Sequence, residues 1–150
     1  MKNIILALMF SVLFCTTALA QGGLVSVKSS HDVMTTANRL ESALKEKGIA
    51  VFARIDHARG AATIGQTLKP TLLVIFGNPA MGTPLIQRSR SMGIDLPLKA
   101  LIWEDRNGQV WFSYNAPDGL VRRHGITEMQ ALIQKMEMAL SNLAQASTLP

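Results

Sequence analysis

The chain has 150 residues, of which 48% are hydrophobic and 17% charged, and it carries a formal net charge of +5. That apolar content favours a folded domain with its own core over a disordered chain. The basic residues are scattered and aromatic residues are few, which argues against a nucleic-acid-binding surface. The only cysteine, Cys15, excludes an internal disulfide and a metal site built from several thiolates.

The first twenty residues have the pattern of a cleavable export signal. Lys2 precedes an uncharged apolar run that ends near Phe14, and the small residues Ala-Leu-Ala end at Ala20. The run is shorter than the roughly 20 residues that a transmembrane anchor needs. We therefore expect residues 1–20 to be a signal peptide cut after Ala20. Residues 21–150 are then expected to form one periplasmic domain that has no membrane contact after cleavage.

The spacing of apolar residues predicts the elements of this domain in chain order. Strands are expected at 24–29, 49–56, 70–76, 99–104 and 109–114. Helices are expected at about 32–47, from 84 to near 93 and from 127 onwards, with a helical turn at about 118–124 and a weakly helical stretch at 57–68. The turn at 105–108 has Asp first and Gly last, which indicates a hairpin between the last two strands.

Polar residues mark where the helices begin. Ser29 or Ser30 is expected to cap the first helix, because a serine oxygen accepts a free backbone N–H there. Thr83 is expected to cap the second helix, with Pro84 as its first residue. Thr127 with the glutamine three residues later has the pattern of a capping box for the last helix.

The element order β-α-β-β-β-β-α, with short helical inserts, predicts an α+β fold with a mostly antiparallel sheet of about five strands. Its two long helices can cover only one face of that sheet. Successive strand residues point to opposite faces, and both Val74 and Ile75 are apolar, as are Ile102 and Trp103. The open face is therefore expected to be apolar, and to be covered by an insert, a second subunit or a ligand.

Five segments of the chain, taken together, resemble one known family. They are FARIDHARGA (52–61), LKPTLLVIFGNPAMGTPL (68–85), DLPLKALIWED (95–105), VWFSYN (110–115) and RHGI (123–126). Their order and spacing are similar to those of the DUF302 family, a domain of unknown function found mainly in bacteria, over residues 24–145. The resemblance implies a fold like that of the TATA-binding-protein class, and it implies no established activity. Ala116 stands where the family usually has Asp, and Gly119 where it usually has Tyr.

Three segments carry side chains that suit a ligand site. Asp56 and His57 end a strand, and a carboxylate with an imidazole can act as an acid/base pair, although neighbouring strand residues point apart. The loop 77–83 leads into a helix start, where free N–H groups can hold an anion. The hairpin strand with Trp103 offers a stacking surface and charged groups. The tentative ligand-binding residues are Asp56, His57, Asn78, Gly82, Thr83, Lys99, Trp103 and Glu104.

The histidines do not have the spacing of a metal site. His31, His57 and His124 lie far apart in the sequence, without the short intervals at which metal ligands recur. We therefore expect no bound metal and no cofactor. Motifs of serine hydrolases, P-loop proteins and dinucleotide-binding proteins are also missing from the sequence.

These observations favour an exported module that binds a small molecule or an anion and forms a homodimer. Two alternatives remain open. One is an enzyme, a hydrolase or isomerase that uses His57 as its general base. The other is a structural protein that binds a partner through the open face of the sheet.

Overall fold

The computed structural model describes residues 19–21 and 23–150, and the core of the expected leader with Cys15 lies outside these residues. Its sheet has the strand order β1-β2-β6-β5-β4-β3, and all neighbouring strands are antiparallel. The strands are β1 (Leu19–Gln21), β2 (Leu24–Lys28), β3 (Ala50–Asp56), β4 (Thr71–Gly77), β5 (Leu98–Glu104) and β6 (Val110–Asn115). The helices are α1 (Val33–Glu46), α2 (His57–Ala62), α3 (Pro79–Arg88), the 3-10 helix η1 (Arg90–Ile94), α4 (Pro117–Arg123) and α5 (Gln130–Thr148). The predicted α+β fold is confirmed, with the short β1 as an additional strand.

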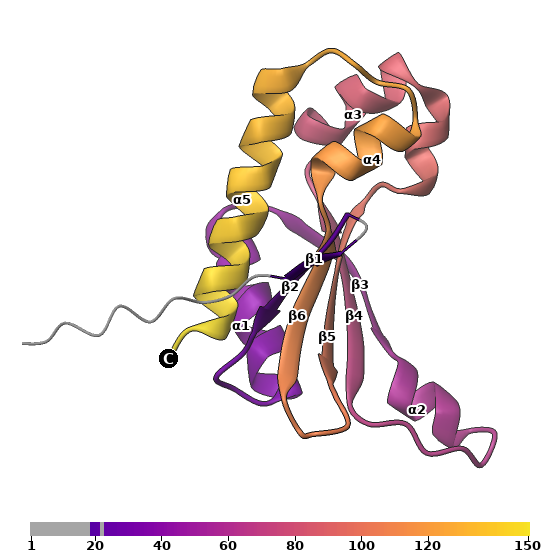
Figure 1. Cartoon of the computed structure of the whole chain (residues 1–150), viewed down its shortest axis with the longest axis vertical. Coiled ribbons are helices and arrows are strands. Elements are labelled where there is room, and N and C mark those ends of the chain that lie inside the picture. Colours follow the sequence, from indigo (N-terminus) through magenta and orange to yellow (C-terminus); the bar gives the residue numbers. More distant parts are fainter. Residues whose placement is uncertain (1–18, 22) are drawn as a thin grey trace, which may run out of the picture.

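The two long helices, α1 and α5, lie on the same face of the sheet (Figure 1). Side chains of alternate strand residues fill the space beneath them: Val74 and Phe76 of β4, Ile102 of β5 and Phe112 of β6 are almost completely buried. Leu40 on α1 is fully buried in the same core cluster. This layer is the main hydrophobic core and fixes the position of α5 along the sheet.

The other face of the sheet carries apolar side chains that neither long helix covers. Leu73 and Ile75 of β4, Leu101 and Trp103 of β5 and Trp111 of β6 are all half-buried there. The two tryptophan rings stack at a centroid distance of 6.5 Å. The strand pattern therefore leaves an apolar surface on β4 and β5 that continues to Trp111, while Ser26 and Ser113 make the same face polar toward β2.

A second, smaller core sits beyond one end of the sheet. There α3, η1 and α4 gather beside the first half of α5 (Figure 1). Leu85, Met92, Leu120 and Ile133 are buried in this second core. The group of short helices rests on the outgoing end of β4 and the incoming end of β5, and it forms the frame of the candidate site.

The hairpin between β5 and β6 forms as the sequence predicts. Gly108 has a φ of 82°, in the left-handed region that favours glycine. The carboxylate of Asp105 accepts the backbone N–H groups of Asn107 and Gln109, each at 2.9 Å. Two turn residues therefore hold the register in which Trp103 pairs with Trp111.

The helix starts differ from the sequence expectations at three places. Asp32 caps α1, because its side chain accepts the N–H of Thr35, so neither Ser29 nor Ser30 has that role. Ser29 is instead buried, and its hydroxyl bonds to Thr36 at 2.7 Å. The expected cap was displaced because an aspartate stood closer to the first helical turn.

The second of these helices begins five residues earlier than predicted. Asn78 is the cap of α3 and Pro79 its first residue, which places Thr83 and Pro84 inside the helix. Either proline could have been the first residue of the helix, because the first-turn N–H groups have no partner within the helix. In the structure Pro79 has that position, and Pro84 is the sixth residue of α3. In the sequence both prolines were equally good candidates for the first helical residue. The helix starts at Pro79, where the side chain of Asn78 provides the cap.

The capping box predicted for α5 does not form. The helix starts after Met129, whose φ of 70° is left-handed and which provides no side-chain cap. The side-chain amide of Gln130 donates to the carbonyl of Thr127 at 3.3 Å, instead of reaching back to a cap N–H. This prediction was wrong because the chain turns sharply at Met129 before the helix begins.

Candidate functional site

An apolar cavity of about 260 Å³ lies where the two cores meet. Its walls come from the start of β3, the end of β4, α3, the segment before β5 and the middle of α5. The apolar wall residues include Ile49, Phe52, Phe76, Met81, Ile86, Leu96, Leu98, Met136, Ala139 and Leu143. An apolar cavity of about 150 Å³ is large enough to hold benzene, so this one has room for a larger molecule.

Phe52 stands at an irregular point of β3. The register of β3 against β4 shifts between Val51 and Ala53, and the residue between them has no partner in the ladder. Such a bulge redirects the side chain of the extra residue. Phe52 is 56% exposed, yet it lines the cavity together with the buried Phe76. The bulge therefore supplies an aromatic ring that is both part of the wall and open to solvent.

Three of the predicted ligand-binding residues line this cavity: Asn78, Gly82 and Thr83. The first turn of α3, however, has no N–H left for an anion. Pro79 lacks one, the N–H of Ala80 donates to Asn78 Oδ1 at 2.9 Å, and those of Met81 and Gly82 donate to the Asn78 carbonyl. The geometry of this end of the molecule therefore suits an apolar ligand better than an anion.

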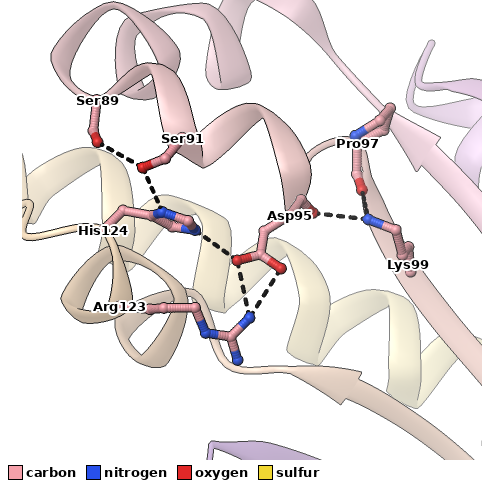
Figure 2. A network of polar contacts seen from close by, with 7 residues as sticks. All are labelled: Ser89, Ser91, Asp95, Pro97, Lys99, Arg123 and His124. Carbon is pink, nitrogen blue, oxygen red and sulfur yellow. Dashed lines mark hydrogen bonds and ion pairs between the residues drawn. The ribbon is translucent and has the colours of Figure 1, made fainter.

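Lys99 holds one wall of the cavity and does not line it. Its ammonium group donates to the backbone carbonyls of Asp95 and Pro97, at 2.9 Å and 2.8 Å (Figure 2). Both bonds act on the segment that contains Leu96, which forms part of the wall. Lys99 is thus placed near the site predicted from the sequence, with a structural role in the wall.

A polar network anchors the same segment from the other side (Figure 2). His124 Nε2 lies 2.6 Å from Asp95 Oδ2, and Arg123 donates to both oxygens of Asp95 at 3.0 Å. Burial alone would raise the pKa of Asp95, but the hydrogen bond from His124 and the charge of Arg123 outweigh it and hold that pKa below its ordinary value. The network ties the end of α4 to the segment before β5.

Asp56 and His57 lie beyond the end of β3 that points away from the cavity, although Phe52 of the same strand lines the cavity. Asp56 pairs with Leu72 near the start of β4, whereas Asn78 follows the end of that strand. A seven-residue strand separates its two ends by about 20 Å. Asp56 caps α2 by accepting the N–H of Arg59 at 2.9 Å, and His57 is exposed at the start of that helix. One site that joins both segments therefore does not form.

Trp103 and Glu104 lie at this same end of the strands, away from the cavity. The indole N–H of Trp103 donates to Ser113 Oγ at 2.9 Å, and Glu104 forms an ion pair with Lys69. Trp111 likewise donates its indole N–H to Asp105. These polar groups are bonded within the sheet and its turn, so the structure does not bring the tentative residues of the hairpin together with those of the loop 77–83.

The three histidines stay apart in the folded chain. His31 bonds to the carbonyl of Leu149 at 2.9 Å, His57 begins α2, and His124 belongs to the network of Asp95. Within residues 19–21 and 23–150, no three potential metal-ligating side chains come together. The same part of the chain contains no helix that is both long and apolar enough to cross a bilayer.

Sequence reasoning missed the contribution of α5 to the cavity. Met136 and Leu140 belong to the strongest helical stripe of the sequence, and such a stripe predicts only that a helix face is buried. Ala139, which lies beside that stripe, lines the cavity as well. No local signal marks the space beside Ala139, since Ala144 is also a small residue of α5 but is buried in the main core.

The sheet, its two long helices and the group of short helices define an α+β domain with an apolar cavity between two cores. The chain belongs to the family described as "Domain of unknown function DUF302", whose model matches residues 25–143. This confirms the resemblance found in the sequence. A DUF302 protein of known structure, from Bacillus stearothermophilus, is 20% identical to this chain and superposes with a TM-score of 0.75. The likeness covers 83% of this chain and 98% of that protein, and it shows the fold alone.

Curated relatives from Brucella share more of the sequence. A protein of Brucella suis named "Fluoride-specific ion channel FluC 1" is 46% identical over 109 residues, which is 73% of this chain and 43% of the relative. A protein of the same name from Brucella abortus is also 46% identical, over 40% of its length. The chain thus spans about two fifths of the length of these relatives.

Proposed function

We propose that this DUF302 domain is a binding module for a small apolar molecule, held in the cavity between α5, α3 and the end of β4. The single observation that carries the proposal is the size and lining of that cavity, about 260 Å³ with almost entirely apolar walls. Cavities of this kind bind ligands by removing their surface from water, while a few polar groups set the orientation. Asn78 and Thr83 are the polar side chains at this wall.

The chemistry of the wall supports a neutral ligand with an aromatic ring or a short aliphatic chain. Phe52 and Phe76 offer aromatic surfaces, and aromatic pairs contribute beyond the area that they bury. Met81 and Met136 are flexible and polarisable, so they can adjust to ligands of slightly different shape. A charged ligand would lose its hydration without gaining a partner, because the N–H groups of the first turn of α3 are already engaged.

A fluorescence titration with N-phenyl-1-naphthylamine, a neutral apolar dye, tests the proposal. Ala139→Phe places a ring in the cavity and is expected to weaken dye binding at least tenfold. Ala131→Phe adds the same ring to an exposed position of the same helix and is expected to leave binding unchanged. Equal affinities in the two variants, or no binding by the wild-type protein, would contradict a ligand site in this cavity.

The same titration separates the alternatives. His57→Ala is expected to leave dye affinity unchanged, because His57 lies at the end of the strands that is remote from the cavity. A loss of binding in that variant alone would move the site to the other end of the sheet. Fluoride belongs in the same experiment as a competitor, since the Brucella relatives are named as fluoride channels. Displacement of the dye by fluoride at millimolar concentration would favour the anion hypothesis over an apolar ligand.

We also propose that the domain forms a homodimer through the open face of its sheet. That face spans five strands at about 4.8 Å spacing and strands of about 20 Å, which gives about 24 Å by 20 Å per copy. Two such faces together reach the roughly 1,000 Å² at which specific interfaces begin. A second copy offers a matching apolar surface, because a two-fold interface joins the same patch on both partners.

Export to the periplasm completes the proposal. The leader pattern of residues 1–20 supports cleavage after Ala20. In the periplasm a domain without a disulfide depends on its core for stability, and the two buried clusters supply that core. The module would then act as a dimer on small apolar molecules outside the cytoplasm.

A further inference from the structure

A serine, a histidine and an aspartate from different elements form one chain of hydrogen bonds (Figure 2). Ser91 belongs to η1, Asp95 follows that helix directly, and His124 is the cap residue at the end of α4. Ser91 Oγ lies 2.8 Å from His124 Nδ1, and His124 Nε2 lies 2.6 Å from Asp95 Oδ2. Both distances are within hydrogen-bond range, and the ring bridges the hydroxyl and the carboxylate with its two nitrogens.

The direction of the protons in this chain follows from Asp95. Because its pKa is held below the ordinary value, the carboxylate is ionised at neutral pH and can only accept. His124 Nε2 therefore carries the hydrogen toward Asp95, and in the neutral ring Nδ1 is left as the acceptor. The hydroxyl of Ser91 must then donate to Nδ1, and Ser89, whose hydroxyl lies 3.1 Å away, donates to Ser91.

The three hydrogen-bonded residues differ in solvent exposure, and the serine is the one that a substrate can reach. The side chains of His124 and Asp95 are 6% and 14% exposed, whereas Ser91 is an exposed residue. The imidazole is thus shielded from water and fixed by Asp95, which Arg123 in turn holds through both carboxylate oxygens. The exposed Ser91 is therefore the residue of the three at which a substrate could bind and react.

We propose that Ser91 is a nucleophile for acyl transfer, with His124 as its general base and Asp95 as the residue that positions the ring. These are the roles that a serine, a histidine and an aspartate have in serine hydrolases, where geometry identifies the site and sequence order does not. The ring nitrogens are exchanged here, since Ser91 contacts Nδ1 and Asp95 contacts Nε2. Since Ser91 lies on the surface, we expect it to react with small, unhindered esters.

The reaction balances with an ester and water as the only reactants. Ser91 Oγ forms a bond to the carbonyl carbon while its proton passes to His124 Nδ1. The bond from that carbon to the leaving oxygen then breaks, and the leaving group takes the proton from His124. In the second half, water attacks the acyl group, His124 accepts a proton from the water, and Ser91 regains it as the acid is released.

Covalent labelling by a fluorophosphonate probe, located by peptide mass spectrometry, tests this proposal, and it does not depend on the cavity. In the wild-type protein the probe is expected to label Ser91, and in Ser91→Ala this labelling is expected to be lost. Ser42→Ala removes an exposed serine of α1 outside the network and is expected to label at the wild-type rate. Absence of label at Ser91 in the folded wild-type protein would overturn the proposal.

The role of His124 has its own readout. His124→Gln is expected to label at least tenfold more slowly, and a wild-type rate in this variant would remove the general base. If the variant does not fold, the pH dependence of the wild-type protein decides. A labelling rate that rises between about pH 5 and 8 supports an imidazole base, and a flat profile contradicts it.

The positioning role of Asp95 is tested by the same pH profile. In Asp95→Asn the imidazolium ion loses its anionic partner, so the midpoint of the profile is expected to move to lower pH. An unchanged midpoint in the folded variant would show that Asp95 acts only in stability. Hydrolysis of p-nitrophenyl acetate, followed by absorbance, is expected to parallel the labelling rate: it should be lost in Ser91→Ala and be slower in His124→Gln.

Discussion

Leu73 of β4 is paired directly with Leu101 of β5, and both side chains lie on the face of the sheet that α1 and α5 leave open. Their chain neighbours Val74 and Ile102 point the other way and are fully buried in the core. The same two strands are therefore apolar on both faces, although only one face is covered by helices. This relationship is the basis of the proposed dimer.

A charge on the open face is expected to separate the two copies of the proposed dimer. Leu73→Lys places an ammonium group at the centre of the proposed interface, where its burial would be costly. Size-exclusion chromatography with light scattering is expected to give a monomer mass for this variant. Gln66→Lys adds the same charge to an exposed loop and is expected to remain dimeric. A wild-type protein that is monomeric at high concentration would contradict the dimer.

Asp95 is expected to make the stability of the domain depend on pH. Its pKa is lower in the folded chain than its ordinary value of 3.8, so its stabilising contribution is complete above that pH and is lost as the pH falls through the folded value. Asp95→Asn should lower the free energy of unfolding by about 1–3 kcal/mol near neutral pH, because His124 and Arg123 lose a charged partner.

Urea unfolding at several pH values measures this contribution. The wild-type protein and Asp95→Asn should converge well below pH 3.8, where the carboxyl group is protonated in both the folded and the unfolded chain. A difference between them that stays constant down to that range would mean that the ionised carboxylate is not the source of the stability.

A better cap on α4 is expected to stabilise the domain. Ala116 occupies the cap position with an extended backbone and makes no side-chain cap bond. The sequence comparison with the family indicated that an aspartate is usual there. Ala116→Asp should raise the free energy of unfolding by about 0.5–2 kcal/mol, because the new carboxylate can accept a free N–H of the first turn. Ala116→Leu, which cannot accept, provides the control in the same thermal or urea unfolding experiment.

The expected leader overlaps the sheet at β1. The strand Leu19–Gln21 pairs with β2, and the expected cleavage after Ala20 would remove two of its three residues. N-terminal sequencing of the exported protein should therefore begin at Gln21, and amide hydrogen exchange should be faster along the exposed edge of β2 than in the uncleaved chain. A mature protein that retains Leu19 would refute this cleavage site.

The fold was predictable because its signals are local. An alternating pattern indicated β2, a short uninterrupted apolar run indicated β4, and Asp105 with Gly108 indicated the hairpin that sets the register of β5 against β6. The helix starts were less certain, since Asp32, Asn78 and Met129 replaced the expected caps. For α1 and α3 two nearby polar residues could each serve as the cap, whereas at α5 the left-handed turn at Met129 leaves the helix without a side-chain cap.

The position of the site was only partly predictable. Two consecutive antiparallel strands run in opposite directions, so their last residues lie at opposite ends of the strand pair. Asp56 at the end of β3 therefore cannot meet Asn78, which follows the end of β4. That conclusion was available from the predicted topology. The contact of Asp95 with His124 was not, because the two residues come from separate elements and no short motif joins them.

Nuclear magnetic resonance of the methionine methyl groups tests the cavity most directly. Met81 and Met136 line the cavity, whereas Met34 and Met138 are 55% and 62% exposed elsewhere on α1 and α5. Adding N-phenyl-1-naphthylamine should shift the signals of Met81 and Met136 in a saturable way and leave those of Met34 and Met138 in place. Shifts confined to Met34 and Met138, or no shift at saturating dye, would contradict a ligand site between α3 and α5.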